Sequence, residues 1–193
     1  MAGLRLRVIN VGGGGSREIP AFYKGWDQDI LDIDPAVKPD ILCDAKKMRT
    51  LKAGKYDAVF CSHNLEHFYK HEVPAVLDGF MHVLKPEGFA QIAVPDMTSL
   101  FEAVKGRDID ETWYTVPAGN ISFHDVIYGW GKMVGSGNEF FSHKCGFTEK
   151  SMTKVLTKAG FKKVFTAVDP AGNLHAYAFK VPPSKSLMQR LGI

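Results

Sequence analysis

Several side chains suited to proton transfer or metal binding stand close together near the middle of the chain. His63, Glu66 and His67 are spaced i, i+3 and i+4, so on a helical turn they would share one face, as metal ligands do. Glu66 and His67 could instead complete the start of a helix, and we favour that interpretation and predict no metal. Histidine also titrates near neutral pH, so we expect a catalytic base among His143, His63 and His124, with His143 first.

A run of four glycines follows a short apolar segment near the N-terminus. Residues 6–16 read LRVINVGGGGS, which predicts a strand that ends on backbone able to approach a ligand closely. The next predicted strand ends in the acidic segment 30–34, and further polar residues follow later strands at 43–44 and 61–63. This spacing predicts one nucleotide-type cofactor site, with a helix after the glycines presenting free N–H groups.

The elements that would position these residues alternate between apolar strands and helical patterns. Helices are predicted over 73–84, with apolar residues at 3.6 spacing, and over 148–159, with Thr148 as N-cap. Residues 169–173 are too few for a crossover helix, so the last two strands should pair as an antiparallel hairpin. We expect an α/β fold with a doubly wound, mostly parallel seven-stranded sheet. The predicted strands are 6–11, 28–32, 41–43, 56–61, 89–94, 163–168 and 175–180.

Residues 105–147 interrupt this alternation with aromatic side chains and glycines. We predict a substrate-capping insert at the carboxyl ends of the strands, although an aromatic satellite core would explain many of the same residues. A chain of 193 residues with 45% hydrophobic content suits one domain, which we place at 1–180. The tail 181–193 has apolar residues at helical spacing that could pack on the same chain or on a twin subunit, which leaves a homodimer open.

Charge and hydropathy exclude some classes of partner. Residues 141–193 hold nine Lys or Arg and two Asp or Glu, and Lys150, Lys154 and Lys158 fall on one helix face. We read this face as solvated, because no basic motif interleaved with aromatic residues points to nucleic acid. No apolar stretch approaches the roughly 18 residues of a membrane helix, so we expect a cytoplasmic protein that acts on a small molecule.

The motifs, in this order, resemble those of small single-domain class I S-adenosylmethionine-dependent methyltransferases of the type 11 kind. The resemblance covers roughly residues 5–180 and implies a Rossmann-like fold, S-adenosylmethionine as cofactor and methyl transfer. The matching segments are VINVGGGG at 8–15, LDID at 31–34, CDA at 43–45, CSHNLEH at 61–67, VLKPEG at 83–88 and AGF at 159–161.

The resemblance also implies roles for individual residues. The glycines would contact the methionine end of the cofactor, Asp32 would accept from the ribose hydroxyls with Asp34 as its rival, and Asp44 would accept from the adenine amino group. Asn10 stands where the family usually has an acidic residue, and Ser16 where it has a glycine. The implied cofactor-binding residues are Asn10, Gly12, Gly13, Gly14, Asp32, Asp34, Asp44, Ala45, Ser62 and His63.

The predicted function is therefore S-adenosylmethionine-dependent transfer of a methyl group to an oxygen or nitrogen atom of a small or medium-sized polar acceptor. An NAD(P)-dependent Rossmann reductase is the alternative enzyme, because a glycine turn and a ribose-binding acid serve both. Arg17, near the place of a third glycine, counts against it. A catalytically inactive cofactor-binding or regulatory protein of the same fold is the non-enzyme alternative.

Overall fold

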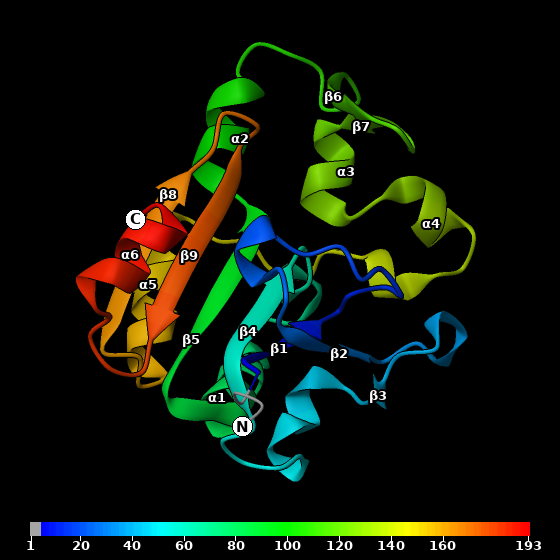
Figure 1. The fold of residues 1–193 in the computed structure, drawn as a ribbon. Coiled ribbons are helices and arrows are strands. Elements are labelled where there is room, and N and C mark those ends of the chain that lie inside the picture. Colours follow the sequence, from blue (N-terminus) through cyan, green and yellow to red (C-terminus); the bar gives the residue numbers. More distant parts are fainter. Residues whose placement is uncertain (1–4) are drawn as a thin grey trace.

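Seven strands form one sheet in the order β3-β2-β1-β4-β5-β9-β8 (Figure 1). The computed structural model describes residues 5–193. Strands β1 to β5 run parallel, and β9 runs antiparallel to both of its neighbours. The mostly parallel seven-stranded sheet and the C-terminal hairpin are thus confirmed. The strands are β1 (Arg7–Val11), β2 (Asp27–Asp32), β3 (Ile41–Leu42), β4 (Tyr56–Ser62), β5 (Leu84–Pro95), β8 (Lys163–Val168) and β9 (Asn173–Phe179).

The two helices predicted from the sequence cover one face of this sheet. Helix α1 (Val73–Val83) buries its apolar stripe against the central strands, where Ile9 is fully buried. Helix α5 (Glu149–Lys158) begins after Thr148, whose Oγ1 accepts a hydrogen bond from Ser151 N at 3.3 Å. Each large apolar side chain buried here contributes about 1.5–3 kcal/mol, so this core fixes the strand ends that carry the site.

The helix expected directly after the glycine run is absent, and that prediction was wrong. Between β1 and β2 the chain forms only the 3₁₀ turn η1 (Ala21–Tyr23), and η2 (Pro35–Val37) and η3 (Ala45–Thr50) replace helices in the next two connections. Pro20 and Gly25 account for the first case. Proline disrupts a helix interior, and Gly25 has a φ of +86°, outside the helical region.

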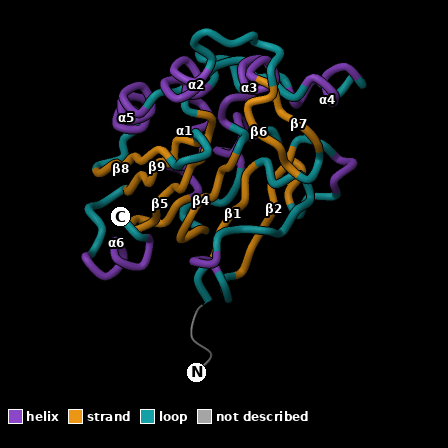
Figure 2. Tube along the Cα trace, turned by 90° about the horizontal axis from the view of Figure 1, so that it is seen from above, coloured by secondary structure: helices purple, strands orange, loops and turns teal. Residues whose placement is uncertain are grey.

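An aromatic cluster and the C-terminal helix cover the second face. Tyr23 is buried, stacks on Phe89 and donates from its hydroxyl to Gln91 Oε1 at 2.8 Å. Helix α6 (Lys185–Leu191) packs its leucines on the same cluster, on the side of the sheet opposite α1 and α5 (Figure 2). The segment 181–193 therefore packs against its own chain, which was one of the two alternatives left open by the sequence.

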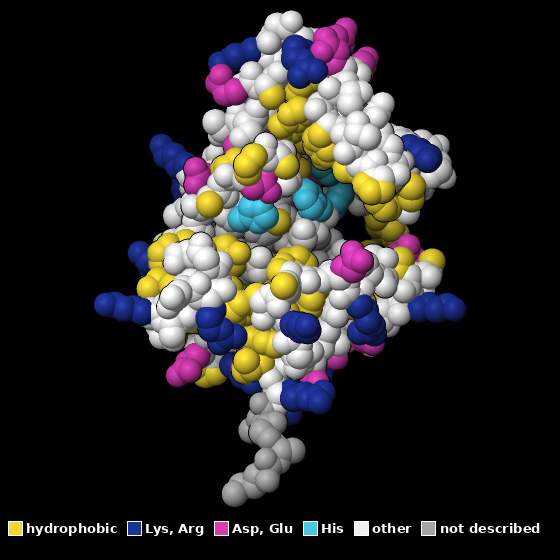
Figure 3. All heavy atoms as spheres, turned by 45° about the horizontal axis from the view of Figure 1, so that its top comes forward, with side chains coloured by type: hydrophobic (Ala, Val, Ile, Leu, Met, Phe, Trp, Pro, Cys, Tyr) yellow, Lys and Arg dark blue, Asp and Glu magenta, His cyan; other side chains and the backbone are white. Residues whose placement is uncertain are grey.

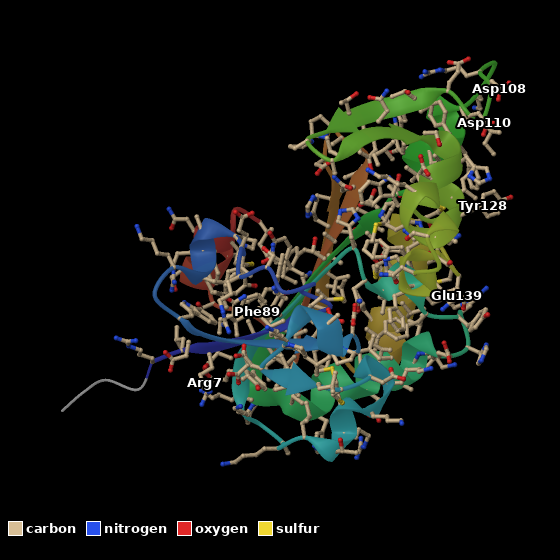
Figure 4. All side chains as sticks on the ribbon, turned by 90° about the vertical axis from the view of Figure 1, so that its right-hand side faces the viewer. Arg7, Phe89, Asp108, Asp110, Tyr128 and Glu139 are labelled. Atoms are coloured by element: carbon tan, nitrogen blue, oxygen red, sulfur yellow. The ribbon has the colours of Figure 1, made fainter. Side chains whose placement is uncertain are left out.

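A smaller lobe stands over the carboxyl ends of the parallel strands (Figure 1). We call residues 105–147 the cap. With α2 it has a small core of its own around Phe123 and Val126. Figure 4 shows Asp108 and Asp110 at the end of the molecule opposite Arg7, where β1 begins. No helix within residues 5–193 is long and apolar enough to span a membrane. The elements between β5 and α5 are α2 (Met97–Ala103), β6 (Thr112–Val116), β7 (Gly119–Ser122), α3 (Phe123–Tyr128), α4 (Gly131–Gly135) and η5 (Glu139–Phe141).

Candidate active site

A cavity of about 440 Å³ lies at the carboxyl ends of β1, β2 and β4, between the sheet and the cap. Its size is within the range of small-molecule sites, and its position is where ligands of open α/β sheets bind. Histidine side chains gather in the hollow between the two lobes (Figure 3). The cap contributes Met133, Asn138, Phe140, Phe141 and Lys144 to the lining.

The glycine loop brings bare backbone to one wall of this cavity. Gly12 has a φ of +71° and donates from its N–H to Leu31 O at 2.8 Å. A Cβ on Gly12 would lie 2.1 Å from Asn64 Nδ2, so only glycine fits there without moving Asn64. Asn10 lies beneath the loop, where its side chain donates to Ser16 O at 3.3 Å. Asn10, which stands where the family usually has an acidic residue, therefore stabilises the glycine loop.

Two acidic residues follow β2, and the structure gives them different surroundings. Asp32 accepts hydrogen bonds from Gly14 N and from Asp34 N, both at 3.0 Å, which fixes its carboxylate beside the glycine loop. Asp34 instead caps η2 by accepting from Ala36 N at 2.8 Å. Both side chains line the cavity. Because a carboxylate oxygen has further lone pairs, Asp32 keeps acceptor capacity for a diol.

The opposite end of this wall is formed by the start of η3. Asp44 caps that turn by accepting from Lys46 N at 3.0 Å, and Ala45 lies beside it in the lining. Lys46 Nζ also contacts Glu72 Oε1 at 2.7 Å. That hydrogen bond lowers the pKa of Glu72. This end therefore presents the fixed carboxylate of Asp44 and a lysine whose charge is paired with Glu72.

Seven of the ten predicted cofactor residues line the cavity, and three do not. Gly13 packs on Asn10, and Ser62 ends β4 outside the lining. The residues in the lining are Gly12, Gly14, Asp32, Asp34, Asp44, Ala45 and His63.

His63 follows β4 in an unusual conformation. Its φ is +47°, which residues other than glycine seldom adopt and which often marks functional sites. The side chain is 48% exposed and lines the cavity, and its Nδ1 lies 3.5 Å from Glu66 Oε1. The neighbouring Glu66 carboxylate raises the pKa of His63 above its usual value.

Glu66, His67 and His143 form a cluster behind His63. The Glu66 side chain is 2% exposed, and the rings of His67 and His143 are 4.8 Å apart. Burial by itself would raise the pKa of Glu66, but the three histidines around it outweigh burial and lower it. The interpretation that Glu66 and His67 complete a helix start is wrong, because the Glu66 carboxylate accepts no backbone N–H within residues 5–193 and the His67 ring contacts Ser142 O in the cap.

The three expected bases occupy different environments. His143 is partly buried, does not line the cavity, and donates from Nδ1 to Val126 O at 2.8 Å. Burial lowers the pKa of His143. His124 is exposed on α3, where it packs against Tyr128, and is also outside the lining. Among these three, only His63 reaches the cavity.

Sequence reasoning missed several lining residues, chiefly Asn64, Phe68 and the cap aromatics Phe140 and Phe141. The cap was predicted as a whole, but no spacing marked which of its side chains would face the sheet. Asn64 could have been predicted, since it lies within the CSHNLEH segment at 61–67 that matches the family.

The comparisons with known proteins agree with this geometry. Residues 10–92 match the family described as the methyltransferase domain. A search of the curated proteins found no match. Many solved structures share the fold, at sequence identities that establish the fold alone.

Three solved structures illustrate the similarity. A SAM-dependent methyltransferase from Archaeoglobus fulgidus superposes with a TM-score of 0.59 at 13% identity, covering 91% of this chain and 86% of that one. The 1,6-didemethyltoxoflavin-N1-methyltransferase of Burkholderia thailandensis, with 1,6-didemethyltoxoflavin and S-adenosylhomocysteine bound, gives 0.56 at 16% identity, covering 92% and 72%. A protein from Methanosarcina mazei described among SAM-dependent methyltransferases gives 0.56 at 14% identity, covering 93% and 94%.

Proposed function

We propose that this chain transfers a methyl group to an oxygen or nitrogen atom of a small or medium-sized polar acceptor. Its matched domain and its fold are those of a class I S-adenosylmethionine-dependent methyltransferase. One observation carries the proposal. The cavity has acidic side chains and bare backbone at its sheet end, and imidazoles and cap aromatics at its other end. The first end suits the cofactor, and the second suits the acceptor.

The sheet end has the groups that the cofactor needs. Asp32 would accept from the ribose hydroxyls, since its carboxylate is already oriented by Gly14 N and Asp34 N. Asp44 would accept from the adenine amino group beside Ala45. The glycine loop leaves room for the methionine portion along Gly12 and Gly14. When bound, S-adenosylmethionine supplies an electrophilic methyl group on a sulfonium sulfur.

The other end would hold the acceptor and receive its proton. The transfer would be an in-line displacement in which the acceptor atom takes the methyl group as the carbon–sulfur bond breaks. Such an in-line displacement depends mainly on positioning and exclusion of water, which Phe140 and Phe141 would provide. His63 is the candidate base for the acceptor proton, because it is the expected base that lines the cavity.

The reductase alternative is not favoured. A dinucleotide pyrophosphate sits at a helix N-terminus after the glycine turn, and only the 3₁₀ turn η1 lies between β1 and β2 here. Arg17 Nη2 donates to both carboxylate oxygens of Asp40, at 2.8 and 2.9 Å, and neither residue is in the cavity lining. Tyr128 and Lys132 have the Tyr-x-x-x-Lys spacing of some reductases, but they lie on separate cap helices outside the lining.

Calorimetric titration with S-adenosylhomocysteine tests the cofactor half of the proposal. Wild-type protein should bind it, and Asp32→Ala should weaken binding roughly 10-fold to 100-fold, as expected for loss of hydrogen bonds to a charged group. Asp34→Ala is the matched control and should weaken binding less. Labelled S-adenosylmethionine with hydroxyl-bearing and amine-bearing acceptors then tests transfer. Binding of NADH in place of S-adenosylhomocysteine would overturn the proposal.

A further inference from the structure

Glu66 is a buried carboxylate without a hydrogen-bond donor. Its side chain is 2% exposed, and neither carboxylate oxygen has a hydrogen-bond partner among residues 5–193. His63 Nδ1, at 3.5 Å from Oε1, is too distant for a good hydrogen bond. A buried charge without such partners is costly, and proteins retain one chiefly where it pairs with a cation or coordinates a metal.

Two histidines beside this carboxylate each keep one ring nitrogen free. His67 Nδ1 lies 3.0 Å from Ser142 O, and His143 Nδ1 lies 2.8 Å from Val126 O. Because a carbonyl oxygen only accepts, both Nδ1 atoms must carry the proton, which leaves each Nε2 with a free lone pair. A ring fixed by one N–H to a backbone carbonyl, with the other nitrogen free, is the usual arrangement of metal-binding histidines.

From this arrangement we propose that Glu66, His67 and His143 bind one divalent transition-metal ion beside the acceptor end of the cavity. One ligand atom from each residue lies within 4.8 Å of the other two, and metal bonds of about 2.0–2.2 Å would draw them closer. Two imidazoles and one carboxylate favour Zn²⁺ and its neighbours in the first transition row over Mg²⁺ or Ca²⁺, which prefer oxygen ligands. Three protein ligands leave a coordination position open.

The position of the ion favours one kind of methyl acceptor over another. This inference rests on the proposed function. His67 lines the cavity, so an ion held by it would lie next to an acceptor at that end. A cation polarises a hydroxyl and eases loss of its proton, whereas a neutral amine has a free lone pair without that help. We therefore assign an oxygen acceptor, a hydroxyl on a small polar molecule.

The site can be tested without any acceptor. Metal-free protein is titrated with Zn²⁺ by calorimetry and with Co²⁺ by visible absorption, with Mg²⁺ as competitor. Wild type should bind one ion per chain, and excess Mg²⁺ should not displace it. Glu66→Gln and His143→Gln should each weaken binding by more than the roughly 10–100-fold that loss of an outer partner costs. His71→Gln, at an exposed histidine outside the cluster, is the matched control and should bind as wild type does.

Further readouts separate failure of this site from failure of folding or of the proposed function. Zn²⁺ should raise the melting temperature of wild type and of His71→Gln, and should leave that of Glu66→Gln unchanged. Binding of S-adenosylhomocysteine by every variant would show an intact cofactor end. Stoichiometric binding that survives both Glu66→Gln and His143→Gln, or no stoichiometric binding by wild type, would overturn the metal site. Absence of S-adenosylhomocysteine binding by wild type would overturn only the function on which the acceptor assignment rests.

Discussion

Two carboxylates near the cavity, Asp32 in its lining and Glu66 behind His63, have different surroundings. Asp32, at the sheet end, accepts N–H groups from its own loop and from the glycine loop. Glu66, at the cap end, is almost wholly buried and has no donor among the described residues. A carboxylate oriented in advance by backbone is ready for neutral hydroxyl donors, whereas a dry carboxylate without donors is suited to a cation. The two acids thus suit different partners because their surroundings differ.

The largest expected effect comes from disturbing the glycine loop beside Asp32. Gly12→Ala places a Cβ 2.1 Å from Asn64 Nδ2 at a φ of +71°. The left-handed backbone costs about 1–2 kcal/mol, and overpacking adds roughly 1–3 kcal/mol. We expect both the free energy of unfolding in urea and the affinity for S-adenosylhomocysteine to fall.

Gly14→Ala is the matched control for this change. Gly14 has a φ of +57°, but a Cβ there meets nothing within 4 Å, so only the backbone cost applies. Equal losses of stability in the two variants would mean that the close approach of Asn64 is unimportant.

A third carboxylate, that of Asp29, resembles Asp32 in having hydrogen-bond donors. Asp29 accepts from Tyr56 Oη at 2.6 Å, Lys55 Nζ at 2.7 Å and Arg7 Nη2 at 3.3 Å. Burial alone would raise the pKa of Asp29, but these three partners outweigh it and lower the pKa below 3.8. Asp29→Asn should therefore lower the free energy of unfolding at pH 7 by about 1.5–3 kcal/mol.

The pH dependence of that loss has a definite sign. Since the folded pKa of Asp29 lies below the ordinary 3.8, its contribution is present above that pH and is lost as the pH falls toward the folded value. Urea unfolding of wild type and Asp29→Asn at pH 7 and near pH 3 measures this. A difference that does not shrink at the lower pH would contradict the assignment.

Exchange of Asp32 or of Glu66 for its amide should lower the free energy of unfolding, and the loss should be larger at Glu66. Asp32→Asn loses a charge-assisted pair of hydrogen bonds and should lower the free energy of unfolding by about 1 kcal/mol. Burial alone would raise the pKa of Glu66, but the surrounding histidines outweigh it and lower the pKa, so in metal-free protein Glu66→Gln removes a charge that stabilises the fold and should lower that free energy by about 2 kcal/mol. Thermal unfolding in the presence of a chelator compares the two. A loss at Glu66 no larger than that at Asp32 would contradict this difference.

The smallest expected effect on stability is at the cap wall. Phe140 is 51% exposed and lines the cavity. Phe140→Ala should change the free energy of unfolding by less than about 0.5 kcal/mol, while raising the KM for acceptor about fivefold, which corresponds to about 1 kcal/mol of lost contact. Tyr128→Ala, at a 57% exposed cap residue outside the lining, should alter neither quantity. Steady-state kinetics with an acceptor found by screening would measure the difference.

The sequence predicted the sheet better than its coverings. Apolar runs ended by glycine, proline or acidic residues marked the strands, because a buried parallel strand is apolar on both faces. The helix after the glycine run was inferred from the glycines and their spacing, although Pro20 and Gly25 already argued against it. The cover provided by Tyr23 and by α6 could not be foreseen, since it depends on segments more than 160 residues apart.

One part of the candidate site could also be predicted from the sequence, and another part could not. Asp32, Asp44 and the glycine loop lie at strand ends, where chain order and parallel pairing place them together. The Glu66 cluster depends on His143, which follows Glu66 by 77 residues and arrives only when the cap returns to the sheet. Spacing within 63–67 suggested a metal set of His63, Glu66 and His67, but the left-handed turn at His63 leaves it at the cavity mouth instead.

Both ends of the segment that includes α2 and the cap meet at one hydrogen bond, from Met97 N to Phe147 O at 2.9 Å. The chain therefore leaves the sheet and returns at a single point, and a doubling of the intervening length adds only about 0.6 kcal/mol of closure entropy. The fold should accordingly tolerate insertions in this segment, deletions from it and its complete replacement, without changes in the strands beneath it. His143 would travel with the exchanged segment, so a new cap would bring a new acceptor specificity and a new complement to Glu66 in one event.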